Sequence, residues 1–110
     1  MELQQLGSMF SALSDPTRLA ILSRLRHGEA TLGELAQPFD MSLQAVSRHL
    51  SVLEAAGLIA RGRDAQRRPC RLKPRALKEI DGWLAEYRKF WDESFDKLEA
   101  RLEARKGRKK

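Results

Sequence analysis

The sequence predicts a mainly α fold, with short helices, a two-stranded β-hairpin and a long C-terminal helix. Three observations support this prediction. Apolar residues recur at spacings of three and four over most of the 110 residues, strand-like alternation is confined to residues 58–72, and capping residues separate the helical stretches. This length corresponds to one domain, which we place at residues 1–105, with a basic tail at 106–110.

Capping signals place the first three helices. The first, at about residues 2–13, has an apolar stripe and ends at the "SDP" turn. Asp15 can cap a second helix with Pro16 at its first position, which ends near Gly28. Thr31 and Glu34 have the spacing of a capping box, so a third, short helix begins there. The stripe of the first helix consists of Leu3, Leu6, Phe10 and Leu13.

The fourth helix is bounded by a cap at each end. Ser42 can cap its start, and the helix extends to about Ala56. Gly57 suits the left-handed position that ends many helices, and Leu58 can then contact Leu53 in a Schellman ending. A polar stretch at 64–66 separates the two arms of the following hairpin. Pro69 predicts that the second arm is an edge strand. The arms carry Ile59, Arg61 and Arg63 on one side and Cys70, Arg71 and Leu72 on the other.

A long helix at about residues 75–104 carries an apolar seam with a 3,4,3,4,7 spacing. Trp83, Phe90 and Phe95 widen it, and one domain of this size offers too little surface to cover it. We therefore predict a homodimer in which the first helix helps to cover the seam of the last. The alternative is a helix that folds back on the core, which would bury mainly its first half. The predicted dimer residues are Leu3, Leu6, Phe10, Leu77, Ile80, Leu84, Tyr87, Trp91 and Leu98.

The positive charge is concentrated in two places. The net charge is +6, and residues 58–75 hold seven basic side chains and one acidic one. The last six residues hold five basic side chains, whereas residues 1–57 and 76–104 are each net negative. A local basic stripe on an otherwise near-neutral body indicates a polyanionic partner. The alternative is a solvated loop and a frayed terminus.

The spacing of the nucleophilic and metal-ligating residues along the chain disfavours both an enzyme active site and a metal site. Ser47 and His49 are two residues apart on a helix and so do not face each other, which excludes a nucleophile–base pair. Cys70, His27 and His49 are scattered, without the spacing that brings two ligands to one ion. We therefore expect no enzyme activity, cofactor or metal, and we place Cys70 in the core. No transmembrane run or secretory signal is visible, and a single cysteine fits a reducing compartment, so we expect a cytoplasmic protein.

One face of the fourth helix is polar and, unlike an ordinary solvated face, has no Glu or Lys until Glu54. With Val46 at the centre of the inner face, Leu43, Leu50 and Leu53 fall beside it. A helix with short polar side chains and an Arg or Gln suits the major groove of DNA. His49 lies at the edge of the inner face, as a packing or phosphate-contacting residue. The predicted outer face and its flanks hold Gln44, Ala45, Ser47, Arg48 and Ser51.

The order of short helix, turn, polar-faced helix and basic hairpin predicts a winged helix-turn-helix at residues 31–72. Double-stranded DNA is then the expected partner. Arginine suits a wing because its planar fork matches the geometry of phosphate oxygens. The wing arginines that we expect at the DNA backbone are Arg61, Arg63, Arg67 and Arg68.

The stretches "ALSDPTRLAILSRL", "LGELAQPFDMSLQAVSRHLSVLEAAGLIARGR" and "WLAEYRKFWDESFDKLEARL" together resemble the ArsR family of bacterial winged-helix repressors. The resemblance extends to about residue 104. It implies a homodimer, held by its first and last helices, that binds operator DNA through a wing from Arg61 to Arg71. The reading-helix positions that it implies are Ser42, Gln44, Ala45, Ser47, Arg48 and His49.

The chain departs from the family's metal-sensing members. They carry Cys-x-Cys on the third helix, where this chain reads Glu34-Leu35-Ala36-Gln37-Pro38, and no histidine follows His49. The sequence thus predicts a homodimeric repressor that binds a pseudo-palindromic operator without a metal. One alternative adds an inducer, either a thiol-reactive species at Cys70 or an organic ligand at the dimer seam. Another is a protein-interaction module that uses the long aromatic helix.

Overall fold

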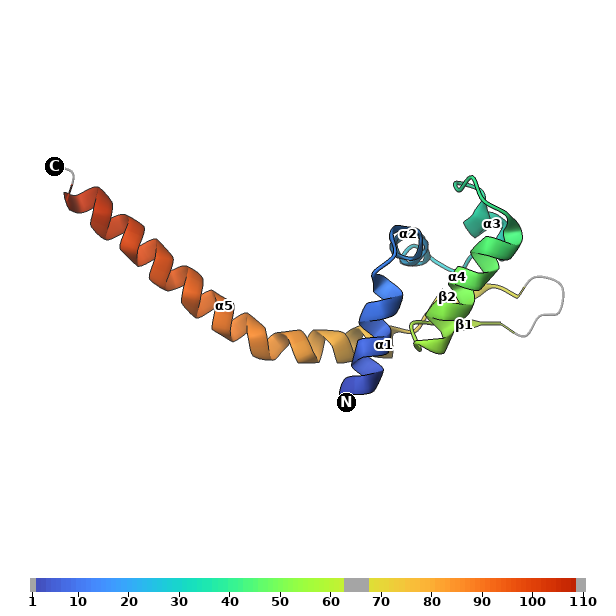
Figure 1. Ribbon diagram of the computed structural model, residues 1–110, viewed down its shortest axis with the longest axis horizontal. Helices are drawn as coiled ribbons and strands as arrows, with labels where there is room; N and C mark the ends of the chain where they lie inside the picture. The colour runs from blue at the N-terminus through green and yellow to red at the C-terminus, as the bar shows by residue number, and fades with distance from the viewer. Residues whose placement is uncertain (1, 63–67, 109–110) are drawn as a thin grey trace. The chain divides into compact units, whose positions relative to one another are not determined.

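The computed structural model describes residues 2–62 and 68–108, with side chains through residue 106. It contains two compact units, Met1–Leu77 and Lys78–Lys110. The predicted single domain over both units stays a prediction. The elements in chain order, labelled in Figure 1, are α1 (Leu3–Leu13), α2 (Pro16–Leu25), α3 (Leu32–Ala36), α4 (Leu43–Ala55), β1 (Ile59–Arg61), β2 (Cys70–Leu72) and α5 (Pro74–Arg108).

Three helices of the first unit begin at the predicted caps. The Asp15 carboxylate accepts from the backbone N–H of Arg18 at 3.1 Å, and Pro16 is the first residue of α2. Thr31 and Glu34 form the reciprocal capping box of α3. The Ser42 hydroxyl accepts from the third residue of α4 at 3.1 Å. Each cap satisfies a backbone N–H that has no partner inside its helix, which fixes the start of that helix.

The end of α4 is the predicted Schellman motif. Gly57 has φ +79°. Its N–H donates to the carbonyl of Glu54 at 2.9 Å, and the N–H of Leu58 donates to the carbonyl of Leu53 at 3.0 Å. Leu58 is fully buried, so the turn directs the chain from the helix straight into β1. The hairpin therefore starts at a fixed distance from the end of α4.

β1 and β2 pair antiparallel, with Ala60 opposite Arg71 and Arg61 opposite Cys70. The hairpin is thus confirmed, with strands of three residues. The expectation that its second arm is an edge strand is wrong at Cys70. Ala30 forms a bridge on the other side of Cys70, through two backbone hydrogen bonds of 2.8 and 3.1 Å. β2 is therefore held between β1 and the segment before α3.

One core joins the elements of the first unit. α4 contacts α1, α2, α3 and β1. Leu43 departs from its prediction, because it is 55% exposed and not on the inner face. Leu6 is only 5% exposed, so it lies in the core and offers little surface to a partner. The largest fully buried side chains of the described chain are Met9, Ile21, Leu35, Val46, Leu50, Leu53, Leu58, Ile59 and Cys70.

The second unit contains most of α5, a helix of 35 residues whose first turn belongs to the first unit. Trp83 and Tyr87, one turn apart, hold their ring centroids 4.7 Å apart at a tilt of 50°. The Arg88 guanidinium pairs with the carboxylate of Asp81 at 2.6 Å. Among the described residues, none of the helices combines the length and the apolar run that crossing a bilayer requires.

Candidate nucleic-acid interface

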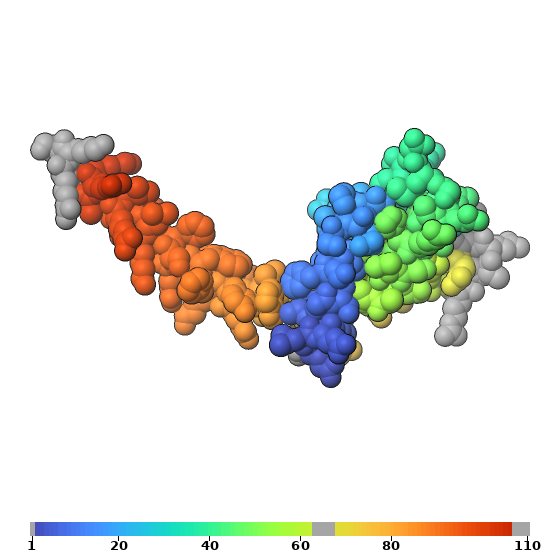
Figure 2. All heavy atoms as spheres, viewed as in Figure 1, coloured from blue at the N-terminus to red at the C-terminus, as the bar shows by residue number. Residues whose placement is uncertain are grey.

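The polar face of α4 is open to solvent. Gln44, Arg48 and Ser51 are all exposed, and so is the capping residue Ser42. Figure 2 shows the surface of this helix, in green, uncovered on one side. Arg48 is exposed, and no hydrogen bond or ion pair joins it to another residue within 2–62 and 68–106. Ala45 and Ser47 are half-buried on the flanks of this face.

Arg61 lies where the predicted wing contact would begin, but it is turned toward the protein. Its side chain is 13% exposed. One guanidinium nitrogen donates to the carbonyl oxygen of Ser47 at 2.9 Å and to the hydroxyl of Ser51 at 3.3 Å. Its Nε is buried without a hydrogen bond, 3.9 Å from a carboxylate oxygen of Glu54. In this structure the arginine connects β1 to α4, and its contact with DNA stays a prediction.

His49 faces α2, in agreement with a packing role. Its Nδ1 lies 3.2 Å from a guanidinium nitrogen of Arg18 and 3.9 Å from a carboxylate oxygen of Asp15. The hydrogen bond from the Arg18 backbone N–H holds the pKa of Asp15 below its ordinary value. Burial opposes this shift, and nearby positive charge from His49 and Arg18 adds to it. Nothing in the sequence pattern drew attention to Arg18. Its position directly after the "SDP" turn, at the start of α2, is the signal that could have done so.

The exposed arginines of the hairpin remain available to an anionic partner. Arg71 is exposed in the middle of β2, and Arg68 is exposed at the start of that arm with φ +37°. The predictions for Arg63 and Arg67 lie outside the described residues. Two of the five predicted wing residues are thus seen on the surface beside Pro69 and Cys70.

Cys70 is a core residue, as predicted. It is 1% exposed, and burial raises the pKa of its thiol. The charges of Arg61 and Arg68 oppose this shift, and the charge of Glu54 adds to it. The thiol is therefore protonated at neutral pH, which makes it a poor nucleophile. Within residues 2–62 and 68–108, no three His, Cys, Asp or Glu side chains are placed to hold one metal ion.

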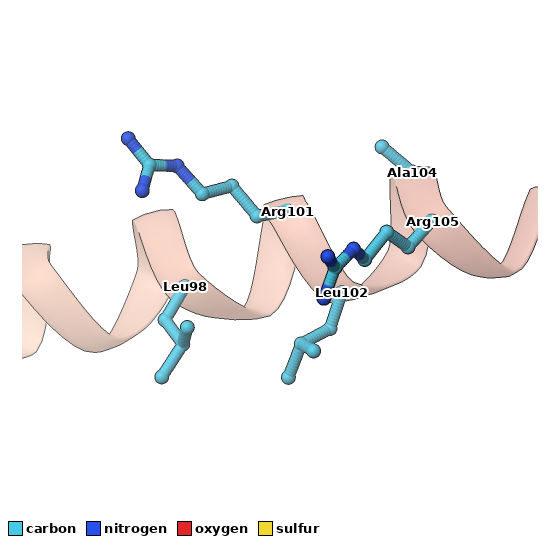
Figure 3. Close-up of a pocket in the computed structure, with 5 residues that line it drawn as sticks. All are labelled: Leu98, Arg101, Leu102, Ala104 and Arg105. Carbon is cyan, nitrogen blue, oxygen red and sulfur yellow. The ribbon is translucent and has the colours of Figure 1, made fainter.

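The apolar residues predicted at a dimer interface are mostly exposed. Along α5, Tyr87, Trp91 and Leu98 are exposed, as are Phe90, Phe95 and Leu102. Figure 3 shows the side chains of Leu98 and Leu102 on one side of α5 and that of Arg101 on the other. The remaining predicted dimer residues divide into exposed Leu3, Phe10 and Leu77, half-buried Leu84, and buried Leu6 and Ile80.

Several known proteins are similar to this chain in sequence. A helix-turn-helix domain family matches residues 13–61. The transcriptional repressor SdpR of Bacillus subtilis is 33% identical over 82 residues, which cover 74% of this chain and 91% of that protein. The HTH-type transcriptional regulator Rv2034 of Mycobacterium tuberculosis is 42% identical over 71 residues, 64% of this chain and 66% of that protein.

Solved structures agree with these sequence relatives. The crystal structure of the ArsR family transcriptional regulator RHA00566 is 39% identical, with a TM-score of 0.77 over 84% of this chain and 95% of that one. The homodimeric winged helix-turn-helix DNA-binding domain Mb0332 of Mycobacterium bovis, solved by NMR, is 28% identical. Its TM-score is 0.62 over 84% of this chain and 83% of that fragment.

Proposed function

The chain belongs to the ArsR family of winged-helix DNA-binding transcriptional regulators, and we propose that it acts as a homodimeric repressor. The dimer binds a pseudo-palindromic operator in bacterial DNA, in the cytoplasm, and needs no metal. The observation that carries this proposal is the open polar face of α4, which presents Gln44 and Arg48 without competing acidic side chains. The family is one of regulators, so no catalytic role is assigned to any residue.

In this proposal α4 is the reading helix. Arg48 lies at the centre of the exposed face and is long enough to reach a base edge, most suitably the O6 and N7 acceptors of guanine. Gln44, one turn earlier, can pair with adenine in the same way. Ser42, Ala45, Ser47 and Ser51 are short, so the helix can approach the floor of the groove.

The hairpin arginines supply contacts to the sugar–phosphate backbone. Arg71 and Arg68 are exposed, and the sequence places Arg63 and Arg67 on the same hairpin. Phosphate contacts fix the register of a protein on the duplex without reading its sequence. Arg61 supports this arrangement from inside, because its hydrogen bonds to Ser47 and Ser51 hold β1 against the reading helix.

Dimerisation is supported by the exposed apolar side chains of α1 and α5, and by the homodimeric state of Mb0332. A two-fold dimer presents two reading helices, so the operator should contain two half-sites with centres about one helical turn apart. Metal independence is supported by the absence of Cys-x-Cys at residues 34–38 of the chain and by the buried, protonated Cys70.

The experiment is selection of bound duplexes from random DNA with chelator-treated protein. We expect enrichment of one pseudo-palindromic sequence, and retention of that sequence at moderate salt with two chains per duplex. Addition of zinc at micromolar concentration should neither release the operator nor bind stoichiometrically. Enrichment of no sequence would contradict the proposal, and release of the operator by zinc would contradict its metal-free form.

A further inference from the structure

We infer that Arg18 is a positioning residue for the reading helix: it fixes which nitrogen of His49 carries the proton, and so makes His49 a hydrogen-bond donor to a DNA phosphate. This inference rests on the proposed role of α4 in binding DNA. Within the predicted reading set, the His49 side chain contacts α2 and the residue that caps it.

Arg18 is held rigidly by the end of α1. Its Nε donates to the carbonyl of Ala12 at 2.6 Å, and its Nη2 donates to the carbonyl of Ser11 at 3.3 Å. The first bond satisfies a carbonyl in the last turn of α1, and the second adds a donor to the Ser11 carbonyl, which also accepts from the N–H and the hydroxyl of Ser14. They also orient the planar guanidinium, so that the remaining nitrogen, Nη1, is directed at Nδ1 of His49 at 3.2 Å.

The chemistry of the two groups decides the position of the proton. A guanidinium has only donors, so Nδ1 of His49 must accept, and the neutral ring must carry its hydrogen on Nε2. The Asp15 carboxylate competes for the same nitrogen. A carboxylate only accepts, so it would require the hydrogen on Nδ1, but its oxygen lies 3.9 Å away. Arg18 is the nearer partner, and it sets the tautomer.

The tautomer matters because phosphate oxygens are acceptors. The His49 side chain is 23% exposed, so the ring is not sealed inside the protein. With hydrogen on Nε2, the ring offers a donor to a phosphate beside the reading helix. With the hydrogen on Nδ1 instead, Nε2 would present a lone pair, which repels a phosphate oxygen. By fixing the tautomer, Arg18 allows His49, which packs between α2 and α4, to donate a hydrogen bond to DNA as well.

The first test measures the tautomer directly in the free protein, by 15N NMR of the imidazole rings at about pH 8.5, where an ordinary histidine is uncharged. The chain has two histidines, so a His27→Gln variant assigns both sets of signals. Wild type should show hydrogen on Nε2 of His49. Arg18→Ala should show hydrogen on Nδ1, shared with Asp15. Arg26→Ala is the matched control, because Arg26 lies 3.5 Å from the ring of the other histidine, His27.

The second test is operator affinity. Arg18→Ala and His49→Ala should each lose affinity about tenfold, the scale of one hydrogen bond to a charged group. In the His49→Ala background, Arg18→Ala should cost no further affinity, because Arg18 acts through His49. If Arg18 only stabilised the end of α1, the two losses would multiply. Arg18→Lys, which keeps a donor, should retain the wild-type tautomer and most of the affinity, even if Arg18→Ala folds poorly.

Three results would overturn the inference: hydrogen on Nδ1 of His49 in wild type, the same tautomer in wild type and folded Arg18→Ala, or multiplicative losses of affinity. Its failure is distinguishable from failure of the proposed function. If wild type retained no duplex, the proposed function and the phosphate contact would fall together. If wild type bound its operator and Arg18→Ala bound it equally well, only the inference would fall.

Discussion

The two compact units of the chain differ in how far their apolar side chains are buried. In residues 2–62 and 68–77, every buried side chain is apolar, and α4 packs against three helices and a strand of the same unit. In α5, the aromatic and leucine side chains from Tyr87 to Leu102 are exposed. The first unit therefore has its own core, whereas the second carries a series of exposed apolar side chains of the kind that marks a protein contact.

This difference separates the part of the fold that buries its own apolar side chains from the part that leaves them exposed. Capping residues set the helix starts of the first unit, and its buried side chains form a core within that unit. The seam of α5 is a pattern of the coiled-coil type, which is stable only when a facing helix covers it. Changes in the first unit should therefore alter how DNA is contacted, and changes in α5 should alter assembly.

The largest effect is expected from Trp91→Glu. A charge in the covered seam would lose its hydration without a partner, which should cost several kcal/mol of dimer stability. The monomer would also lose the avidity of two linked half-site contacts, about a hundredfold or more in operator affinity. Light scattering and operator titration measure the two effects.

Ala100→Glu is the matched control for Trp91→Glu. Position 100 is half a helical rotation away from position 91, on the opposite face of α5, and it is exposed. The control adds the same charge to the same helix and should leave a dimer. The prediction that the apolar seam of α5 holds the dimer would be contradicted if wild type were monomeric at micromolar concentration. It would also be contradicted if both variants changed the oligomeric state equally.

A smaller effect is expected from Arg61→Ala. Loss of its bonds to Ser47 and Ser51 should loosen the hairpin from α4 and reduce operator affinity about tenfold. Since Arg61 points into the protein, the dependence of affinity on salt should keep its slope. A shallower salt slope in this variant would show that Arg61 contacts phosphate after all.

Arg71→Ala provides the contrasting case on the same hairpin. Its side chain is exposed, so its loss should weaken binding to specific and scrambled duplexes alike. The slope of log affinity against log salt should fall by about one unit for each phosphate contact removed. Salt titrations of both variants on both duplexes make the comparison. Affinity lost only on the operator would assign Arg71 to base reading instead.

The smallest effect is expected at Cys70. Because burial raises the pKa of its thiol, the reactive thiolate is even scarcer at neutral pH than for a free cysteine, and it increases only as the pH rises above the ordinary cysteine range. A thiol-reactive dye should label native protein very slowly at pH 7 and unfolded protein rapidly. Cys70→Ser should bind the operator as wild type does. Rapid labelling accompanied by operator release would instead support a thiol-responsive repressor.

The helix boundaries could be predicted from sequence because their signals are local. Asp15, Thr31 and Ser42 each act within three residues, and the turn at Gly57 depends on one left-handed residue. Positions that depend on distant partners were predicted less well. The bridge between Ala30 and Cys70 joins segments 40 residues apart, and no local pattern signals it.

In the candidate site, too, features with a local sequence signal could be predicted better than features that depend on distant residues. Periodicity identified the exposed face of α4 around Arg48, but it placed Leu43 inside, because the first turn of a helix has no preceding turn to define its inner side. Charge alone assigned Arg61 to the wing surface. Its actual direction depends on acceptors at Ser47 and Ser51, which lie 14 and 10 residues earlier in the chain. Composition cannot distinguish an arginine that contacts DNA from one that supports the contact.

The central claim, that the outer face of α4 reads bases, is tested most directly by measuring base preference at every operator position with wild type and with Arg48→Ala. The measurement uses all single-base variants of the selected operator at one salt concentration. Arg48→Ala should lose about 1–3 kcal/mol on the operator and lose preference at one position in each half-site, leaving the other positions unchanged. An unchanged preference at every position, with or without a uniform loss of affinity, would contradict the claim that this helix reads the operator.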